Sequence, residues 1–580
     1  MPPTQGPGGS TAAFLDRAER ELLELSSEDE RSEWVYATFV TDDTEVLASK
    51  AKSRLIAGTV RLLKESSSLR PDGADPVQAR KLKLLPLRLT LVGPSDPAES
   101  EELTRTVASM SGIYAKGRHV LAGASEPLDL QGLSRVLIET RDPAQLEDAW
   151  TGWHRVGRAV RPGFDRYVTL ANRGCRELGF ADQGAMWRSK YDMDPAAFAT
   201  EVDRLWSEVR PLYDALHAYT RRRLRESYGA DRVPERGPIP SHLLGNMWAQ
   251  SWDGIYPLLA PTSAGRGFDL TRLLAARGTT PTEMVKIAEA FFVSLGLAPL
   301  PSSFWERSML VRPRDREVVC HASAWDIDYV NDLRIKMCIE ITGEDFTTIH
   351  HELGHNYYQR AYGAQPVLFR DSAHDGFHEA IGDAVALSIT PEYLVRIGLL
   401  DSAPSAEGDI GLLLERALEK VAFLPFGLAV DKWRWEVFSG KIPPREYNRS
   451  WWDVRGEYQG VAPPSPRGED EFDAGAKYHV PANVPYMRYF LAHILQFQFH
   501  RALVRAAGAS GPLHRATIHG SVEAGRRLNA MLEMGMSREW PDALEALTGE
   551  RRMSASALLE YFAPLQRWLA EQNRGAPVGW

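Results

Sequence analysis

The sequence predicts a mainly α-helical protein with a very small β-sheet. Three observations carry this fold class: long charged stretches place apolar residues at helical spacing, strand-like runs are few, and proline and glycine gather in short loops. The hydrophobic fraction of 44% and the charged fraction of 25% are ordinary for a globular protein. A chain of 580 residues can bury a large core without disulfide bonds to stabilise it.

Three stretches are typical of long helices. Residues 12–63 are charged and rich in Leu and Ala, with no proline or glycine before Gly58, which suits amphipathic helices. In 196–228 the apolar residues fall near helical spacing, and a third helix is expected over 485–507. The prolines within 460–470 predict a loop there instead.

The predicted sheet is a single hairpin. Residues 317–327 and 334–341 are short and partly β-branched, and Asn331 and Asp332 between them allow the two segments to pair antiparallel. The chain shows no internal repeat, low-complexity block or central linker. We therefore expect a single domain over 1–580, although length alone would allow several.

Charge, hydropathy and cysteine content narrow the function classes. The formal net charge of −9 argues against a nucleic-acid partner, which needs a basic surface. No apolar run is long enough to anchor the chain in a membrane, and residues 1–10 lack the charged-then-apolar pattern of a signal peptide. The three cysteines, Cys175, Cys320 and Cys338, form neither a disulfide scaffold nor a zinc-finger spacing.

An H-E-x-x-H motif gives the first sign of chemistry. Positions i and i+4 share one face of a helix, so His351 and His355 can hold one metal ion, with Glu352 placed to act on a metal-bound water. Residues 345–348 offer capping groups for the start of this helix. Alone, the motif also fits a solvated helix face, and the neighbouring His350 is expected to have no metal role.

A second segment, 376–383, supplies a third ligand. Catalytic zinc takes three protein ligands and keeps one position open for water. Glu379 and Asp383 are four residues apart, so they also share one face of a helix. Glu379 would complete a His, His, Glu site, and Asp383 would accept the free ring N–H of a histidine ligand. His378 is a rival ligand, but it is rotated by about a quarter turn from Glu379. We prefer Glu379.

The stretch 350–388 resembles the zinc-binding region of the angiotensin-converting enzyme family. The resemblance continues in family order through LLGNMWAQSW (243–252), CHASAWD (320–326), YQGVAPP (458–464), FDAGAKYHVPANVPYMRYF (472–490), LQFQFH (495–500) and MSASALLEYF (553–562). It implies one catalytic domain with a two-lobed helical fold and a deep central channel. Residues 1–11 would be a flexible segment, and 12–115 would be either a helical lid or simple outer packing.

The resemblance also implies individual residue roles. The zinc ligands would be His351, His355 and Glu379, with one ion per chain. Glu352 would be the general base, and Asp383 would support a histidine ligand. The tetrahedral intermediate would be stabilised by His479 and Tyr489, and the substrate backbone would be held by His321 and Ala322.

Three further residues match the group that grips the terminal carboxylate of the substrate: Gln250, Lys477 and Tyr486. A lysine supplies charge, and an amide and a phenol supply directed donors. A carboxypeptidase branch of the family has arginine at the position of Gln250, which leaves room for one residue only. Glutamine therefore implies release of dipeptides from oligopeptides with a free C-terminus. Without the resemblance, the three would be interpreted as surface polar groups.

Chloride is a second implied cofactor, as an activator. Arg188, Trp451 and Arg455 match one chloride site of the family, and Tyr219 and Arg488 match the other. A buried arginine more often pairs with a carboxylate, which is the alternative interpretation.

One disulfide is implied, because Cys320 and Cys338 match a cysteine pair of the family whose other disulfides are missing here. A disulfide indicates an oxidising compartment, whereas no leader sequence is visible. We expect a periplasmic or secreted mature chain, with the cytoplasm as the alternative.

Three other functions are compatible with parts of this sequence. A carboxypeptidase of the same fold would release single residues, and Gln250 argues against it. A zinc endopeptidase would not need the carboxylate-binding group. A non-catalytic peptide-binding homologue would usually lack a ligand or the base, and this sequence has all of them.

Overall fold

The structure, a computed structural model, describes residues 10–261 and 268–580, so the expected flexible segment 1–11 lies almost entirely outside the described residues. Helices dominate, and the strands in these ranges form only two short pairs. The predicted fold class is confirmed. None of the described helices has the length and apolar character needed to cross a membrane.

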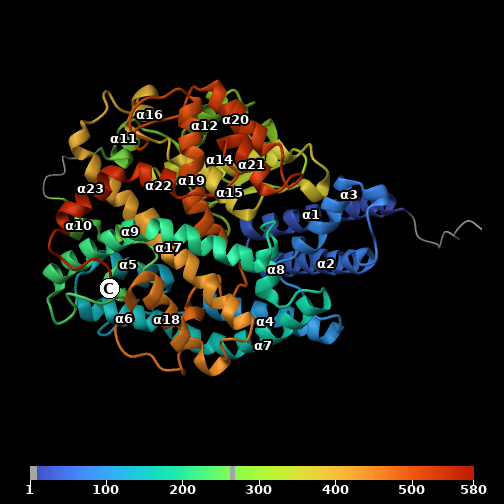
Figure 1. The fold of residues 1–580 in the computed structure, drawn as a ribbon, viewed down its shortest axis with the longest axis horizontal. Coiled ribbons are helices and arrows are strands. Elements are labelled where there is room, and N and C mark those ends of the chain that lie inside the picture. The colour runs from blue at the N-terminus through green and yellow to red at the C-terminus, as the bar shows by residue number, and fades with distance from the viewer. Residues whose placement is uncertain (1–9, 262–267) are drawn as a thin grey trace, which may run out of the picture.

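Two bodies of helices and an N-terminal arm make up the molecule (Figure 1). The body drawn lower in this view includes α4 (Pro97–Ala115), α5 (Leu130–Glu139), α6 (Pro143–His154), α7 (Val156–Glu177) and α18 (Tyr447–Gln459). The body drawn upper includes α11 (Leu270–Ala276), α12 (Pro281–Ser294), α14 (Gly343–Tyr362), α15 (Asp375–Ala386), α16 (Pro391–Arg396), α19 (Met487–Ala506), α20 (Val522–Leu532) and α21 (Trp540–Thr548).

Two long helices lie between the bodies, α9 (Pro195–Tyr228) and α17 (Asp409–Phe438). The helices outside the arm that remain are short: α8 (Gln183–Ser189), α10 (Tyr256–Leu259), α13 (Ser302–Arg307), α22 (Ser556–Tyr561) and α23 (Ala563–Gln572). The helices predicted over 196–228 and 485–507 are confirmed as α9 and α19.

The arm contains α1 (Thr11–Thr38), α2 (Asp42–Ser66) and α3 (Pro76–Leu84). The predicted helical stretch 12–63 is thus two helices. The break between them is fixed by Thr41, whose hydroxyl accepts a hydrogen bond from the backbone N–H of Thr44 at 3.1 Å. The Thr44 hydroxyl accepts one in return from the Thr41 N–H at 3.0 Å, which satisfies two free donors at the start of α2.

Two large hydrophobic cores hold the helices in place, and the larger one extends through both bodies. α15 packs between α14 and α19, where Ile349, Phe377 and Phe490 are fully buried. A second core surrounds α7 and α17 and contains Phe164 and Trp433. The first core fixes the two helices that carry the H-E-x-x-H motif and the predicted third ligand.

The predicted hairpin is confirmed, with shorter strands. β2 (Ser323–Asp326) and β3 (Leu333–Lys336) are antiparallel, and Ala324 pairs with Ile335. A second pair was not predicted: β1 (Ile239–Pro240) runs parallel to β4 (Val461–Ala462), inside the stretch interpreted as a loop. This pair joins segments far apart in sequence, so no local pattern indicates it.

The arm meets the hairpin region at the end of α1. The Val40 N–H donates to the Glu317 carbonyl at 2.9 Å, and the Val319 N–H donates to the Ala37 carbonyl at 2.8 Å. These bonds hold the last turn of α1 over a large cavity, which Tyr36 helps to line.

Candidate metal centre and substrate channel

Helix α14 carries the H-E-x-x-H motif, and its start differs from the sequence prediction. The capping residue is Thr342, whose hydroxyl accepts a hydrogen bond from the Asp345 N–H at 3.0 Å. The prediction that residues 345–348 cap the helix is therefore wrong, because these residues already lie inside its first turns. Thr342 is the kind of residue that N-caps favour, and it lies three residues before the predicted segment.

Three side chains converge on one point between α14 and α15. Ligand atoms of His351, His355 and Glu379 all lie within 4.8 Å of one another. The two histidines face each other through Nε2, 3.0 Å apart, and His351 Nε2 lies 3.7 Å from Glu379 Oε2. Two imidazole nitrogens and a carboxylate oxygen, from three residues, are the donor set of a catalytic zinc site.

Close packing of α14 on α15 brings the ligands together. A methyl group on Gly354 would lie 2.9 Å from the Cα of Gly382, and one on Gly382 would lie 2.7 Å from the ring of His351. Real Cβ atoms do not approach other atoms this closely. The two glycines therefore set the distance between the helices.

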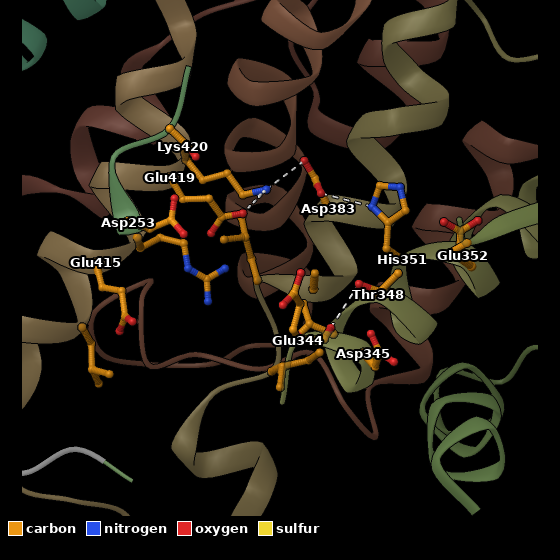
Figure 2. A pocket seen from close by; sticks show the side chains of 18 of the residues that line it. Asp253, Glu344, Asp345, Thr348, His351, Glu352, Asp383, Glu415, Glu419 and Lys420 are labelled. Atoms are coloured by element: carbon orange, nitrogen blue, oxygen red, sulfur yellow. Dashed lines mark hydrogen bonds and ion pairs between the residues drawn. The ribbon is translucent and has the colours of Figure 1, made fainter. Parts of the chain in front are cut away.

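Asp383 holds His351, as the sequence analysis expected. The His351 Nδ1–H donates to Asp383 Oδ1 at 3.1 Å, and Lys420 on α17 lies 3.4 Å from the other carboxylate oxygen (Figure 2). Burial alone would raise the pKa of Asp383, but the charge of Lys420 and the bond from His351 hold that pKa well below its usual range. The carboxylate stays ionised and keeps the Nε2 lone pair of His351 directed at the metal position.

The two other histidines of these motifs do not face the metal position. His350 is buried and bonds the Phe346 carbonyl and the Tyr393 hydroxyl, each through a ring nitrogen. His378 contacts Nδ1 of His355, at 2.8 Å, on the side away from the three ligand atoms.

The metal centre lies where two cavities meet. One has a volume of about 1200 Å³ and the other about 1300 Å³, and both are lined by His321, Ala322, His351 and Glu352. Glu352 is 8% exposed and faces this junction. A carboxylate here can reach a water molecule or a peptide bond at the metal.

His479 and Tyr489 line the larger cavity, with their rings 5.6 Å apart. Burial lowers the pKa of His479 to about 2 and raises the pKa of Tyr489 to about 12. Both side chains are therefore neutral near pH 7 and can donate hydrogen bonds. His479 Nδ1 is buried without a partner among the described residues, so it is free to bond a ligand.

Three polar side chains lie together in the same cavity, and we name them the carboxylate clamp after the role predicted for them. Lys477 Nζ donates to Gln250 Oε1 at 2.7 Å, and the Tyr486 hydroxyl donates to the same oxygen at 3.3 Å. Burial lowers the pKa of Lys477 to about 7. Across the described ranges, Lys477 has no carboxylate partner, which leaves its charge available to a bound anion.

Comparison with known proteins agrees with this geometry. A peptidase M2 family model, described as angiotensin-converting enzyme, matches residues 9–580. The chain belongs to the angiotensin-converting enzyme family. This is a family of metallopeptidases, and its zinc dependence agrees with the His, His, Glu site of this chain.

Curated angiotensin-converting enzymes are similar over nearly the whole chain. The Bos taurus enzyme is 42% identical over 575 residues, which cover 98% of this chain and 44% of that protein. The Mus musculus enzyme is 41% identical over 576 residues, which cover 98% of this chain and 43% of that protein. The Theromyzon tessulatum enzyme is 41% identical over 561 residues, which cover 95% of this chain and 90% of that protein. The chain thus spans less than half the length of the first two relatives.

The first chloride set derived from the resemblance is not brought together. Arg455 is fully buried, and its guanidinium stacks on Trp451, 5.5 Å from the ring centre. Arg188 stacks instead on Trp435 at 4.8 Å and faces carboxylates, chiefly Asp182. Arg188 and Arg455 thus lie against different aromatic rings, and no contact between them is found among the described residues.

The second chloride set is also separated. Arg488 pairs with Asp375 at 3.2 Å and interacts with Tyr191, just before α9 begins. Tyr219 lies 24 residues after the first residue of α9, Pro195, or about 36 Å along the helix. Its hydroxyl donates to the Leu259 carbonyl. Tyr219 and Arg488 are therefore not brought together.

The disulfide expected from the angiotensin-converting enzyme family is present. Cys320 and Cys338 are bonded, with their Cα atoms 5.1 Å apart, and they flank the β2–β3 hairpin. Cys175 is buried and has a free thiol.

Sequence reasoning missed a set of acidic residues around the smaller cavity. Facing carboxylates come from three elements: Asp253, Glu344, Glu415 and Glu419 (Figure 2). Burial and mutual repulsion raise the pKa values of Glu344 and Glu415. These residues are far apart in sequence and follow no motif, so only the fold reveals the cluster.

Proposed function

We propose that this chain is a zinc-dependent peptidyl-dipeptidase that releases dipeptides from the C-terminal end of oligopeptides. The observation that carries the proposal is the carboxylate clamp of Gln250, Lys477 and Tyr486 in the cavity that the metal centre opens into. A buried lysine without a protein carboxylate suits a substrate that brings its own. The similarity to angiotensin-converting enzymes supports the same conclusion.

The chain's own residues supply binding and proton transfer. Zinc held by His351, His355 and Glu379 would act as a Lewis acid toward the attacking water and the peptide carbonyl. Glu352 accepts the proton of that water and then delivers it to the leaving amine as the C–N bond breaks. His479 and Tyr489 donate hydrogen bonds to the carbonyl oxygen as negative charge develops on it, each contributing about 3 kcal/mol.

Mass spectrometry of the products from an N-blocked peptide tests the proposal. We expect an intact C-terminal dipeptide, no product after treatment with a chelator, and little cleavage of the C-terminally amidated peptide. Release of single residues would instead indicate a carboxypeptidase, and equal cleavage of the amidated peptide an endopeptidase. Bound zinc without any cleavage would indicate a peptide-binding protein.

Replacement of Glu352 by Gln tests the general base. The variant keeps its shape and removes the proton acceptor, so we expect kcat to fall about 10²- to 10⁴-fold. Zinc content, measured by atomic absorption, should stay at one ion per chain. An active Glu352→Gln enzyme would contradict the assignment.

Chloride activation is proposed for the surroundings of Arg455 alone. This guanidinium is fully buried, lies against three aromatic rings, and donates to an amide and a carbonyl rather than to a carboxylate. We expect Arg455→Gln to reduce the stimulation of kcat/KM by added chloride by about tenfold. Arg188→Gln, outside this cluster, should leave it unchanged. A chloride response that is the same in both variants would exclude the site.

A periplasmic or secreted location is proposed because a disulfide persists in oxidising compartments. Thiol alkylation of the denatured protein from its native source should detect one free cysteine, Cys175. Three alkylated cysteines would indicate a reducing compartment and the cytoplasmic alternative.

A further inference from the structure

His378 has no part in the proposed chemistry, yet it contacts a metal ligand. Its Nδ1 lies 2.8 Å from Nδ1 of His355, and its Nε2 lies 3.3 Å from the hydroxyl of Tyr362. Within residues 10–261 and 268–580, His378 is the only hydrogen-bonding partner of His355 Nδ1. The ring is held by Tyr358, with the ring centres 4.8 Å apart.

The direction of each hydrogen bond follows from the metal site. His355 presents Nε2 to the ligand cluster, so this nitrogen must keep its lone pair and the ring proton must sit on Nδ1. The His355 Nδ1–H therefore donates to Nδ1 of His378. The proton of a neutral His378 must then sit on Nε2, from which it donates to the oxygen of Tyr362.

The geometry requires a neutral His378, because its Nδ1 must accept the hydrogen bond from His355. A protonated His378 would have no lone pair for His355 and would place a second positive charge beside the metal.

We propose that His378 and Tyr362 form a neutral hydrogen-bond relay that fixes the tautomer and the ring orientation of His355 and so strengthens metal binding. His378 is a positioning residue: it acts through His355 and does not touch the metal position. The inference rests on the zinc site of the proposed function.

The two histidine ligands are thus supported differently. His351 has an ionised carboxylate, Asp383, which Lys420 neutralises. A carboxylate in the place of His378 would be buried directly next to Glu379 in the sequence, and the repulsion would raise both pKa values. A neutral imidazole accepts the same hydrogen bond without adding charge.

Zinc affinity of the metal-free full-length chain, measured by competition with a chromogenic chelator, tests the relay. His378→Phe keeps a ring and removes the acceptor, so we expect zinc to bind about 10- to 100-fold more weakly. His378→Asn keeps an acceptor near the Nδ1 position and should recover most of that loss. Tyr362→Phe should weaken binding by a smaller factor, about two- to fivefold.

The chain offers a matched control. His350 and Tyr393 form the same kind of buried pair, 3.2 Å apart, with no contact to a ligand. His350→Asn and Tyr393→Phe should bind zinc like the wild type, and thermal unfolding of every metal-free variant separates affinity from folding. If His378→Phe does not fold, the zinc affinities of His378→Asn and Tyr362→Phe test the relay instead.

The outcomes separate the relay from the site itself. A wild-type chain that binds no zinc would overturn the proposed function. If the wild type binds zinc and His378→Phe binds it with the same affinity, the relay alone is overturned. Equal losses in the His378 and His350 variants would likewise overturn it, because they would indicate a general packing effect.

Discussion

Lys477 shows how burial sets the chemistry of a single residue. Its pKa is lowered to about 7 by desolvation, and among the described residues it has no carboxylate to restore the charge. His479, in the same cavity, is kept neutral by burial in the same way. Each group would gain its missing interaction from the substrate, Lys477 from the terminal carboxylate and His479 from the reacting carbonyl oxygen.

We predict that kcat/KM for peptides with a free C-terminus falls as pH rises through about 7, because the free enzyme then loses the charge of Lys477. Lys477→Gln should lower kcat/KM about 10- to 100-fold at pH 6 and abolish this alkaline decline. pH profiles of the two enzymes provide the test. An unchanged decline in the variant would mean that another group titrates.

The candidate site residues that sequence reasoning located best share a helix or a short segment. Helical periodicity puts His351 and His355 on one face and Glu379 and Asp383 on another, and the family resemblance joins the two pairs in one site. Tyr219 and Arg188 were grouped with other residues by resemblance alone, and the packing of α8 and α9, which no local pattern reports, does not bring them to those residues.

At the level of secondary structure, the crossing of α14 on α15 determines the metal geometry. Helix α14 carries two ligands and α15 carries one, and each helix contributes a glycine at the point of closest approach. The helices and the hairpin were predictable because periodicity and turn residues are local. The pairing of β1 with β4 and the contact of the two glycines were not, because both depend on segments far apart in the chain.

We predict that Gly382→Ala separates α14 from α15. Its methyl group would meet the ring of His351 at 2.7 Å, which should cost about 1–3 kcal/mol in the free energy of unfolding and weaken zinc binding. Urea denaturation and chelator competition measure the two effects. Gly456→Ala on α18 is the control, since nothing lies within 4 Å of its added methyl group. Equal stability of both variants would show that the helices tolerate separation.

The whole molecule provides a channel with two chemically different sides. The larger cavity presents the carboxylate clamp and neutral donors, whereas the smaller presents Asp253, Glu344, Glu415 and Glu419. Lys420 and Arg416 offset part of this charge, but Lys420 already contacts Asp383 and Glu419. A peptide held at the metal therefore meets an acidic wall on one side.

We predict that this acidic wall favours substrates with a basic side chain near the cleaved bond. With Lys and Glu compared at the residue just before the cleaved bond of an N-blocked peptide, which lies on the side of the metal away from the carboxylate clamp, Lys should give about two- to fivefold higher kcat/KM at low ionic strength. Added salt should reduce the ratio, because screening weakens exposed charges. Since the pKa of Glu344 is raised, the ratio should grow as pH rises from acidic to neutral and the wall ionises.

Glu344→Gln should lower the ratio, whereas Glu101→Gln, on the outer surface of α4, should not. A ratio that neither salt nor Glu344→Gln alters would place the selectivity in packing rather than charge.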